Sequence, residues 1–282
     1  MRRYLFAGGT AVVTGAANGI GAALAHGLAA RGSGLVLVDR DAEGLGAVRA
    51  EVRAARPGWP VATYVEDLAD GPGTTALGKR IATEHPGVRL LVNNAGVGLA
   101  GRFDQVDVED VEWVLDVNLQ APIRLTHALL PTLKANPGSH VALLSSVLGL
   151  VGAYGQSAYC TSKFGLRGFG EVLRQELVED DVGVTTVHPG GIRTGVARAA
   201  RVGSGVTPEE YEEGMAEFER VLTIEPADAA RRILDGIERR RPRVLIGATA
   251  TVPDAVARLL PTRYPAAVAR LARSRGGAVR PR

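Results

Sequence analysis

Tyr159 and Lys163 stand four residues apart in the segment SAYCTSKFG, residues 157–165. If this segment is helical, their side chains lie on one face, one turn apart. A tyrosine phenol has a pKa of about 10, too high for a base at neutral pH, and a nearby ammonium favours the phenolate. The pair therefore indicates either an acid/base site or an ordinary surface pair, the commoner meaning of such spacing.

Two further polar residues lie at the ends of predicted elements. Ser146 ends an apolar run, where its hydroxyl could bond a substrate oxygen. Asn118 lies in the helical stretch 104–134, which we expect to split there because Pro122 suits the first turn of a new helix. A kink at this point would free groups of Asn118 to hold a water against Lys163. Open α/β sheets bind ligands at the carboxyl ends of their strands, so these residues predict a site at one sheet edge.

Short apolar runs alternate with helical patterns along the chain. The runs are continuously apolar, as parallel strands buried on both faces should be. Strands separated by helices predict an α/β fold with a parallel seven-stranded sheet and right-handed crossovers. The strands are expected at 10–15, 34–39, 60–65, 88–93, 140–146, 182–188 and 243–247. The helices are expected at 19–31, 42–55, 70–84, 104–134 and 157–179.

A glycine-rich turn joins the first predicted strand to the first predicted helix. Its glycines are Gly15, Gly19 and Gly21, in the spacing G-x-x-x-G-x-G. Gly15 permits a tight turn, and the other two let the backbone approach a pyrophosphate beside the N–H groups of the helix. This context favours a dinucleotide site over a turn that binds nothing.

Acidic residues follow the second and third strands. Asp39 can bond a ribose 2′-hydroxyl and repel a 2′-phosphate, which favours NAD; Arg40 could hold that phosphate, which leaves NADP as the alternative. A solvated turn acid is the plainer interpretation of Asp39. Asp67 could accept a bond from an adenine amino group with Leu68 behind the ring, or it could cap a helix.

These motifs together resemble the classical short-chain dehydrogenase/reductase family over about residues 8–247. Ser146, Tyr159 and Lys163 keep the separations of that family. The segments that carry the resemblance are TGAANGIG (14–21), NNAG (93–96), Asn118 in DVNLQAP, Ser146 in SSVLG, YCTSK (159–163) and HPGGIRT (188–194).

The resemblance implies a doubly wound Rossmann-type fold with helices on both faces of the sheet, and hydride transfer between nicotinamide C4 and an alcohol or carbonyl carbon. Tyr159 would be the general acid/base, and Lys163 would lower its pKa and bind the nicotinamide ribose. Ser146 would orient the substrate oxygen, and Asn118 would hold a water in the proton relay. A catalytically idle dinucleotide-binding sensor or scaffold is a second hypothesis.

The resemblance also implies a set of cofactor-binding residues on the strand ends and the loops that follow them. Among them, the backbone of Ile192 and the hydroxyl of Thr194 would fix the carboxamide. The full set is Gly15, Asn18, Gly19, Ile20, Gly21, Asp39, Arg40, Asp67, Leu68, Asn94, Ala95, Gly96, Tyr159, Lys163, Pro189, Gly190, Ile192 and Thr194.

The segment 147–156 is largely apolar, with Tyr154 and Gln156 as polar handles. It predicts a medium-sized, mainly apolar secondary alcohol or ketone, of aliphatic, steroid-like or polyketide-like type. The predicted substrate residues are Ser146, Leu148, Gln156 and Tyr159.

The histidines show no metal-ligand spacing, and His188 simply precedes Pro189 at a strand end, so no metal site is predicted. The single cysteine, Cys160, gives no disulfide framework and indicates a reducing, cytoplasmic location; we expect a packed, neutral thiol.

We expect one catalytic domain over 1–250, with a substrate lid at about 195–222, and a basic amphipathic extension over 251–282. From residue 252 onward, seven arginines face one acid, so the rest of the chain is near −3 although the net charge is +3. A nucleic-acid partner therefore has little support. The extension should pack on its own domain or on a partner subunit, with an anionic membrane surface as a less favoured alternative. A homodimer or homotetramer is expected.

Overall fold

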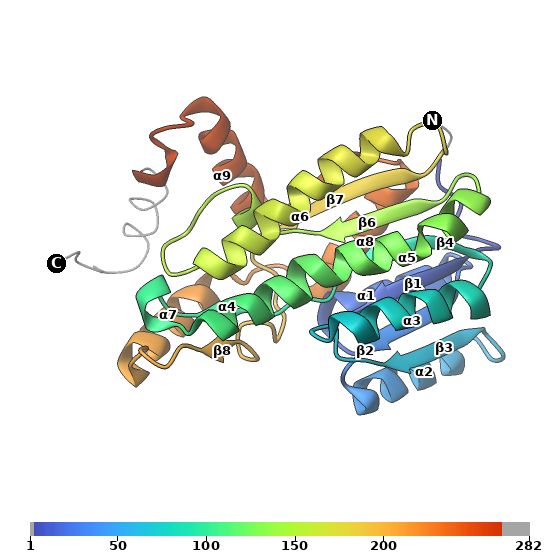
Figure 1. Ribbon diagram of the computed structural model, residues 1–282, viewed down its shortest axis with the longest axis horizontal. Helices are drawn as coiled ribbons and strands as arrows, with labels where there is room; N and C mark the ends of the chain where they lie inside the picture. Colours follow the sequence, from blue (N-terminus) through green and yellow to red (C-terminus); the bar gives the residue numbers. More distant parts are fainter. Residues whose placement is uncertain (1–2, 267–282) are drawn as a thin grey trace.

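The computed structural model describes residues 3–266. It contains a seven-stranded, fully parallel sheet in the order β3-β2-β1-β4-β6-β7-β9 (Figure 1). The strand order reverses direction between β1 and β4, so the carboxyl ends of these two strands form the switch point of a doubly wound sheet. Each predicted apolar run is one strand of this sheet. The strands are β1 (Thr10–Thr14), β2 (Gly34–Asp39), β3 (Val61–Val65), β4 (Val88–Asn93), β6 (His140–Leu144), β7 (Gly183–Pro189) and β9 (Arg243–Ile246).

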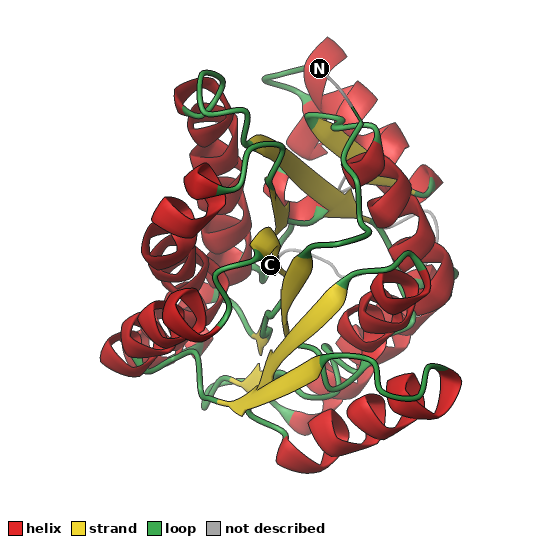
Figure 2. Ribbon diagram, turned by 90° about the vertical axis from the view of Figure 1, so that its right-hand side faces the viewer, coloured by secondary structure: helices red, strands yellow, loops and turns green. Residues whose placement is uncertain are grey.

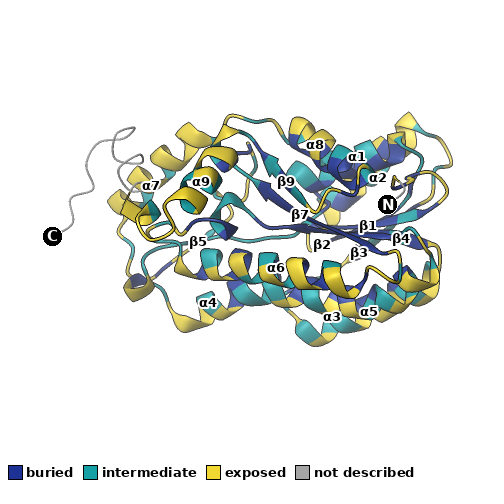
Figure 3. Ribbon diagram, turned by 90° about the horizontal axis from the view of Figure 1, so that it is seen from above, coloured by how far each residue is buried: buried dark blue, intermediate teal, exposed yellow. Residues whose placement is uncertain are grey.

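Helices cover both faces of the sheet, as Figures 2 and 3 show. Val13 of β1 belongs to the apolar core under one helix layer, and Val12 to the core under the other. Both faces of a central strand are therefore buried, which is why these strands are continuously apolar. One layer consists of α1 (Gly19–Ala30), α2 (Ala42–Ala55) and α8 (Pro226–Glu238), and the other of α3 (Gly71–Glu84), α5 (Ala121–Ala135) and α6 (Ser157–Glu176).

The expected split near Asn118 is not a break. The helix α4 (Val108–Leu115) passes through a π-helical turn, η2 (Asp116–Gln120), directly into α5. Pro122 lies in the first turn of α5, where its missing N–H costs little. The predicted division into two α-helices near Asn118, with Pro122 in the first turn of the second, is confirmed, but the junction is a π turn that changes the hydrogen-bond spacing without ending the helical path. Such turns are frequent at functional sites.

The segment that follows β7 folds back over the carboxyl ends of the strands. It contains β8 (Arg201–Val202), which pairs with β5 (Leu99–Ala100), and α7 (Pro208–Val221), which has no buried residue. Arg201 bonds Asp110 at 2.7 Å, and its guanidinium lies 3.9 Å from the centre of the Trp113 ring. The middle of the predicted lid is thus attached to α4.

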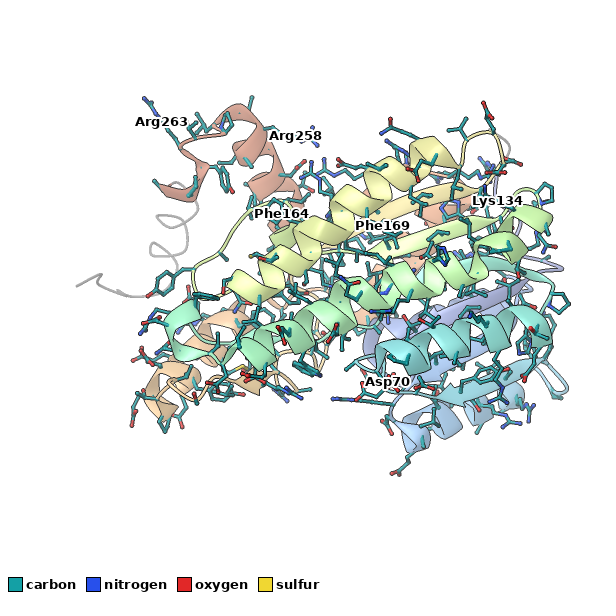
Figure 4. The ribbon with its side chains drawn as sticks, viewed as in Figure 1. Asp70, Lys134, Phe164, Phe169, Arg258 and Arg263 are labelled. Atoms are coloured by element: carbon teal, nitrogen blue, oxygen red, sulfur yellow. The ribbon has the colours of Figure 1, made fainter. Side chains whose placement is uncertain are left out.

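The chain continues from β9 directly into α9 (Ala248–Leu259). Within α9 only Ala250 is buried, and Leu259 is 80% exposed, so the predicted apolar face does not pack on this domain. Arg258 and Arg263 lie on the projecting C-terminal part of the described chain (Figure 4). Residues 267–282 of the predicted extension fall outside the described residues. Between residues 3 and 266, no helix combines the length and the apolar character needed to cross a membrane.

Candidate active site

The glycine turn lies between β1 and α1 at the switch point. Gly15 has a φ of +64°, and a Cβ on Gly21 would lie 1.8 Å from the Gly15 carbonyl oxygen. No side chain caps the N-terminus of α1 at the exposed Asn18, which leaves the first N–H groups of the helix for another acceptor. A turn with this close backbone approach and these free donors fits a pyrophosphate.

Thr14 and Asn94 join the glycine turn to the end of β4. The Thr14 hydroxyl accepts bonds from the backbone N–H groups of Asn94 and Ala95, each at 3.0 Å. The Asn94 amide donates to the carbonyls of Thr14 and Gly15, at 2.9 and 3.0 Å. The Asn94 side-chain amide nitrogen therefore braces the glycine turn, and the cofactor contact of Asn94 stays a prediction.

Asp39 closes the other side of the turn from the end of β2. Its carboxylate accepts bonds from the backbone N–H groups of Ala17 at 3.0 Å and Asp41 at 3.1 Å. Arg40, beside it, is exposed. The carboxylate of Asp39 is therefore held in one orientation against the glycine turn, which favours the cofactor interpretation of Asp39 over a solvated turn acid.

The remaining predicted cofactor residues surround the same edge. Asp67 is exposed and accepts a bond from the N–H of Ala69 at 3.0 Å, while Leu68 is buried. The N-cap position of α3 is Asp70, whose side chain makes no capping bond. The Thr194 methyl lies 3.3 Å from the place of a Cβ on Gly19, so the chain after β7 reaches the glycine turn. Around these lie the half-buried Ile20, Pro189 and Gly190 and the buried Ile192.

Tyr159 and Lys163 lie together on α6. The Lys163 amine is 5.5 Å from the centre of the Tyr159 ring and donates to the Leu144 carbonyl at 3.0 Å. Lys163 is 3% exposed, so the surface-pair interpretation is wrong. Burial lowers the pKa of Lys163 to about 8.

The same burial acts in the opposite direction on Tyr159. It raises the pKa of that phenol to about 12, while the side-chain interaction with Ser146 lowers the pKa and the neighbouring Cys160 raises it. Burial also raises the pKa of the Cys160 thiol, in keeping with the expected packed, neutral cysteine.

Ser146 follows the last residue pair of β6 and begins a 3₁₀ turn, η3 (Val147–Gly149). Its hydroxyl accepts a bond from the N–H of Leu148 at 3.1 Å. Since it also interacts with the Tyr159 phenol, these two hydroxyls share one side of the site. Leu148, Gln156 and Tyr159 are each partly exposed there, as substrate contacts must be.

Asn118 is fully buried in the π turn. Its amide oxygen accepts from the Val97 N–H at 2.8 Å, and its amide nitrogen donates to the Val97 carbonyl at 3.0 Å and to the Ser162 hydroxyl at 3.2 Å. The side-chain amide therefore bonds protein groups, and the water held by groups of Asn118 stays a prediction. Asn118 lies beside Lys163 nonetheless, because a Cβ on Gly96 would be 3.3 Å from both side chains.

Several residues that support the site were missed in the sequence. Ser145 donates to the Lys163 carbonyl at 2.9 Å, and a Cβ on Gly149 would lie 2.2 Å from the Ser145 hydroxyl oxygen. The Thr249 hydroxyl, on α9, accepts from the Gly191 N–H at 3.1 Å. Only the doubled serine in SSVLG hinted at the first contact. No local pattern signals a bond over the 58 positions that separate Gly191 from Thr249.

Comparison with known proteins identifies this arrangement. Residues 9–204 match the family model described as short chain dehydrogenase. This chain belongs to the short-chain dehydrogenase family. A putative oxidoreductase, SadH, from Mycobacterium tuberculosis is 37% identical over 268 residues, covering 94% of this chain and 95% of the relative.

Two solved structures of the family have a similar fold. One is a metagenomic short-chain oxidoreductase in complex with NADP, with 30% identity, a TM-score of 0.70, and coverage of 86% of this chain and 97% of the other. The second is a Burkholderia phymatum short-chain dehydrogenase/reductase in complex with NAD, with 26% identity, a TM-score of 0.80, and coverage of 95% and 96%. The present chain is an NAD(P)-dependent oxidoreductase of this family.

Among residues 3–266, no group of three or more histidine, cysteine, aspartate or glutamate side chains is arranged to hold a metal ion.

Proposed function

We propose that the protein interconverts a medium-sized, mainly apolar secondary alcohol and its ketone with NAD(H), and that Tyr159 exchanges the substrate proton. The observation that carries this proposal is the placement of Tyr159 against the buried amine of Lys163 and the hydroxyl of Ser146. These groups lie at the carboxyl edge of the sheet, where open α/β sheets bind their ligands.

Each residue has one task in the proposed reaction. Tyr159 gives its proton to the carbonyl oxygen in reduction and takes the hydroxyl proton in oxidation. Ser146 donates to the same substrate oxygen, and Lys163 stabilises the phenolate and bonds the cofactor ribose. The nicotinamide, when bound, supplies or accepts the hydride. Asn118 acts here by holding Val97 and Ser162 around the amine of Lys163.

The acid/base role has a direct test. We expect Tyr159→Phe to lower kcat by about 10²–10⁴-fold, the usual contribution of a positioned acid/base group, with little change in NAD affinity. The measurement is the absorbance of reduced nicotinamide with a panel of secondary alcohols and ketones, with fluorescence titration for binding. A Tyr159→Phe enzyme as active as wild type contradicts the proposal. Tight NAD binding by a wild type that turns over no substrate would favour the sensor hypothesis.

NAD is proposed over NADP because the carboxylate of Asp39 is fixed beside the glycine turn, where it repels a 2′-phosphate. Arg40 supports NADP as the second candidate. We expect Asp39→Ala to bind NADP at least about tenfold more tightly relative to NAD, because one charge repulsion is removed. Arg40→Ala is the matched control and should lower NADP affinity alone. Unchanged selectivity in Asp39→Ala would contradict the NAD assignment.

The domain assignment and partners belong to the same proposal. The segment 195–222 covers the substrate as a lid, the catalytic domain spans 1–250, and 251–282 is an appended extension. The working form is a homodimer or homotetramer. Liposome sedimentation of the full chain against a 1–250 truncation separates an extension that packs on protein from one that binds an anionic membrane surface.

A further inference from the structure

His188 of β7 forms a hydrogen bond to the segment that follows β6, beyond the last residue pair between these two strands. It is the second-to-last residue of β7, directly before Pro189, and it is 1% exposed. Its Nδ1 lies 3.0 Å from the backbone carbonyl oxygen of Ser146. Because a carbonyl oxygen only accepts, the ring carries its hydrogen on Nδ1 and donates it to Ser146.

The imidazole is neutral in this position. Burial lowers the pKa of His188 to about 4; the bond to Ser146 and the charge of Asp254 oppose this shift, and the charges of Arg243 and Arg167 add to it. A neutral ring that donates from Nδ1 has a lone pair on Nε2.

The His188 ring borders a cavity of about 290 Å³ between α6, β7 and β9. Glu171, Arg174 and Gln175 of α6 line this cavity, together with Arg243. None of the described residues donates a hydrogen bond to Nε2, so this nitrogen is not what holds the ring in place. The bond that does so is the one to Ser146.

Ser146 needs such a support because it lies beyond the sheet. The last residue pair between β6 and β7 is Leu144 with Val187, so no strand neighbour bonds the backbone at Ser146; apart from the His188 bond, its carbonyl oxygen accepts only the local bond from the Gly149 N–H at 3.0 Å among the described residues. The His188 ring, one position further along β7, provides a side-chain hydrogen bond to this backbone in place of a strand pair. On the other side, the Ser146 hydroxyl is held by the N–H of Leu148.

We propose that His188 is a positioning residue for Ser146: its Nδ1–H fixes the Ser146 backbone so that the hydroxyl faces Tyr159 and the substrate oxygen. This inference rests on the function proposed above. It goes beyond that function because His188 would act only through its bond to the Ser146 carbonyl.

A matched pair of variants separates positioning from simple packing. His188→Asn places an amide N–H where Nδ1 stood, and His188→Leu fills a similar volume without a donor. We expect His188→Leu to lower kcat about tenfold, the size of a lost neutral hydrogen bond, and His188→Asn to stay within about threefold of wild type. NAD affinity should be unchanged in both.

The pH dependence supplies a readout that packing alone would not move. Ser146 lowers the pKa of Tyr159, so a misplaced hydroxyl should shift the acid limb of kcat/KM for alcohol oxidation to higher pH. This shift is expected in His188→Leu and in Ser146→Ala, and not in His188→Asn.

Added imidazole provides a second measurement should His188→Leu fail to fold. His188→Ala leaves a ring-sized space beside the cavity, and imidazole as the probe should enter it and restore most of the lost kcat. Wild type and Ser146→Ala should not respond to imidazole.

The outcomes distinguish this inference from the proposed function. Equal activity and equal pH profiles in the Asn and Leu variants overturn the role of His188, as does an Ala variant that imidazole does not rescue. An inactive wild type, or a Ser146→Ala enzyme as active as wild type, overturns the proposed function instead.

Discussion

At the scale of single residues, Lys163 is held in a place that disfavours its charge. It lies 3% exposed under the sheet edge, and the one hydrogen bond that its amine makes to residues 3–266 goes to the Leu144 carbonyl. Removing water from an ammonium lowers its pKa, because the charged form loses hydration that one carbonyl does not replace. The charged form of Lys163, which the proposed reaction needs, therefore destabilises the folded protein when no anion is bound nearby.

Replacing that amine tests this cost. We expect Lys163→Met to have a higher free energy of unfolding than wild type near pH 7. The difference should be at most roughly 3 kcal/mol, reduced by the contribution that the hydrogen bond to the Leu144 carbonyl makes to wild-type stability. The folded pKa, about 8, lies below the ordinary 10.5, so between these values the unfolded chain binds more protons and wild-type stability rises with pH. Urea unfolding across this range should show the two proteins converging. Parallel stability curves would mean that the Lys163 amine is hydrated.

At the scale of elements, β1, α1 and the turn between them form one unit whose glycines are not interchangeable with others. A Cβ on Gly21 would lie 1.8 Å from the backbone oxygen of Gly15, whereas a Cβ on Gly46, inside α2, meets nothing within 4 Å. Both glycines are in helices, where alanine is intrinsically favoured. The two positions differ because the fold brings the Gly15 carbonyl against Gly21 and leaves open space at Gly46.

The two glycines predict opposite results. We expect Gly21→Ala to abolish detectable NAD(P) binding, because the turn must open to admit the methyl group. Gly46→Ala should bind normally and gain about 0.5–1 kcal/mol of stability. Fluorescence titration and thermal melting measure the two effects. Normal cofactor binding by Gly21→Ala would show that the turn is not the phosphate site.

At the scale of the whole molecule, the outer face of α6 lacks a partner within residues 3–266. Phe164, labelled in Figure 4, is 38% exposed and Val172 is 52% exposed, with Gly168 between them at the same helical spacing. Small and apolar residues in one stripe suit close packing against a second helix. The working dimer proposed above should bury this face.

Charge placed in the stripe tests the assembly. We expect Phe164→Glu to shift the protein toward monomer in light scattering with size-exclusion chromatography, because a buried carboxylate without a partner is costly at an interface. Val65→Glu is the control, since Val65 is 58% exposed on the edge strand β3 at the far end of the sheet. An unchanged mass for Phe164→Glu would place the interface elsewhere.

The seven strands, the helices between them up to α6 and the glycine turn could be predicted from local patterns, whereas α7 and α8, between β7 and β9, were not predicted. The predicted features are local, because continuous apolar runs, helical spacing and glycine positions each involve only a few neighbouring residues. A strand that is buried on both faces of a sheet is apolar at every position, so it can be recognised in the sequence. Tyr159 and Lys163 were identifiable for the same reason, since one helical turn joins them.

Only the tertiary structure decided what supports the site. Thr14 meets Asn94 across 80 positions, and His188 meets Ser146 across 42. Such contacts depend on strand order and on how far each strand extends, neither of which any short pattern encodes. The lowered pKa of Lys163 also depends on the tertiary structure. The spacing from Tyr159 would be the same on a solvated helix, and only the fold removes water from the Lys163 amine.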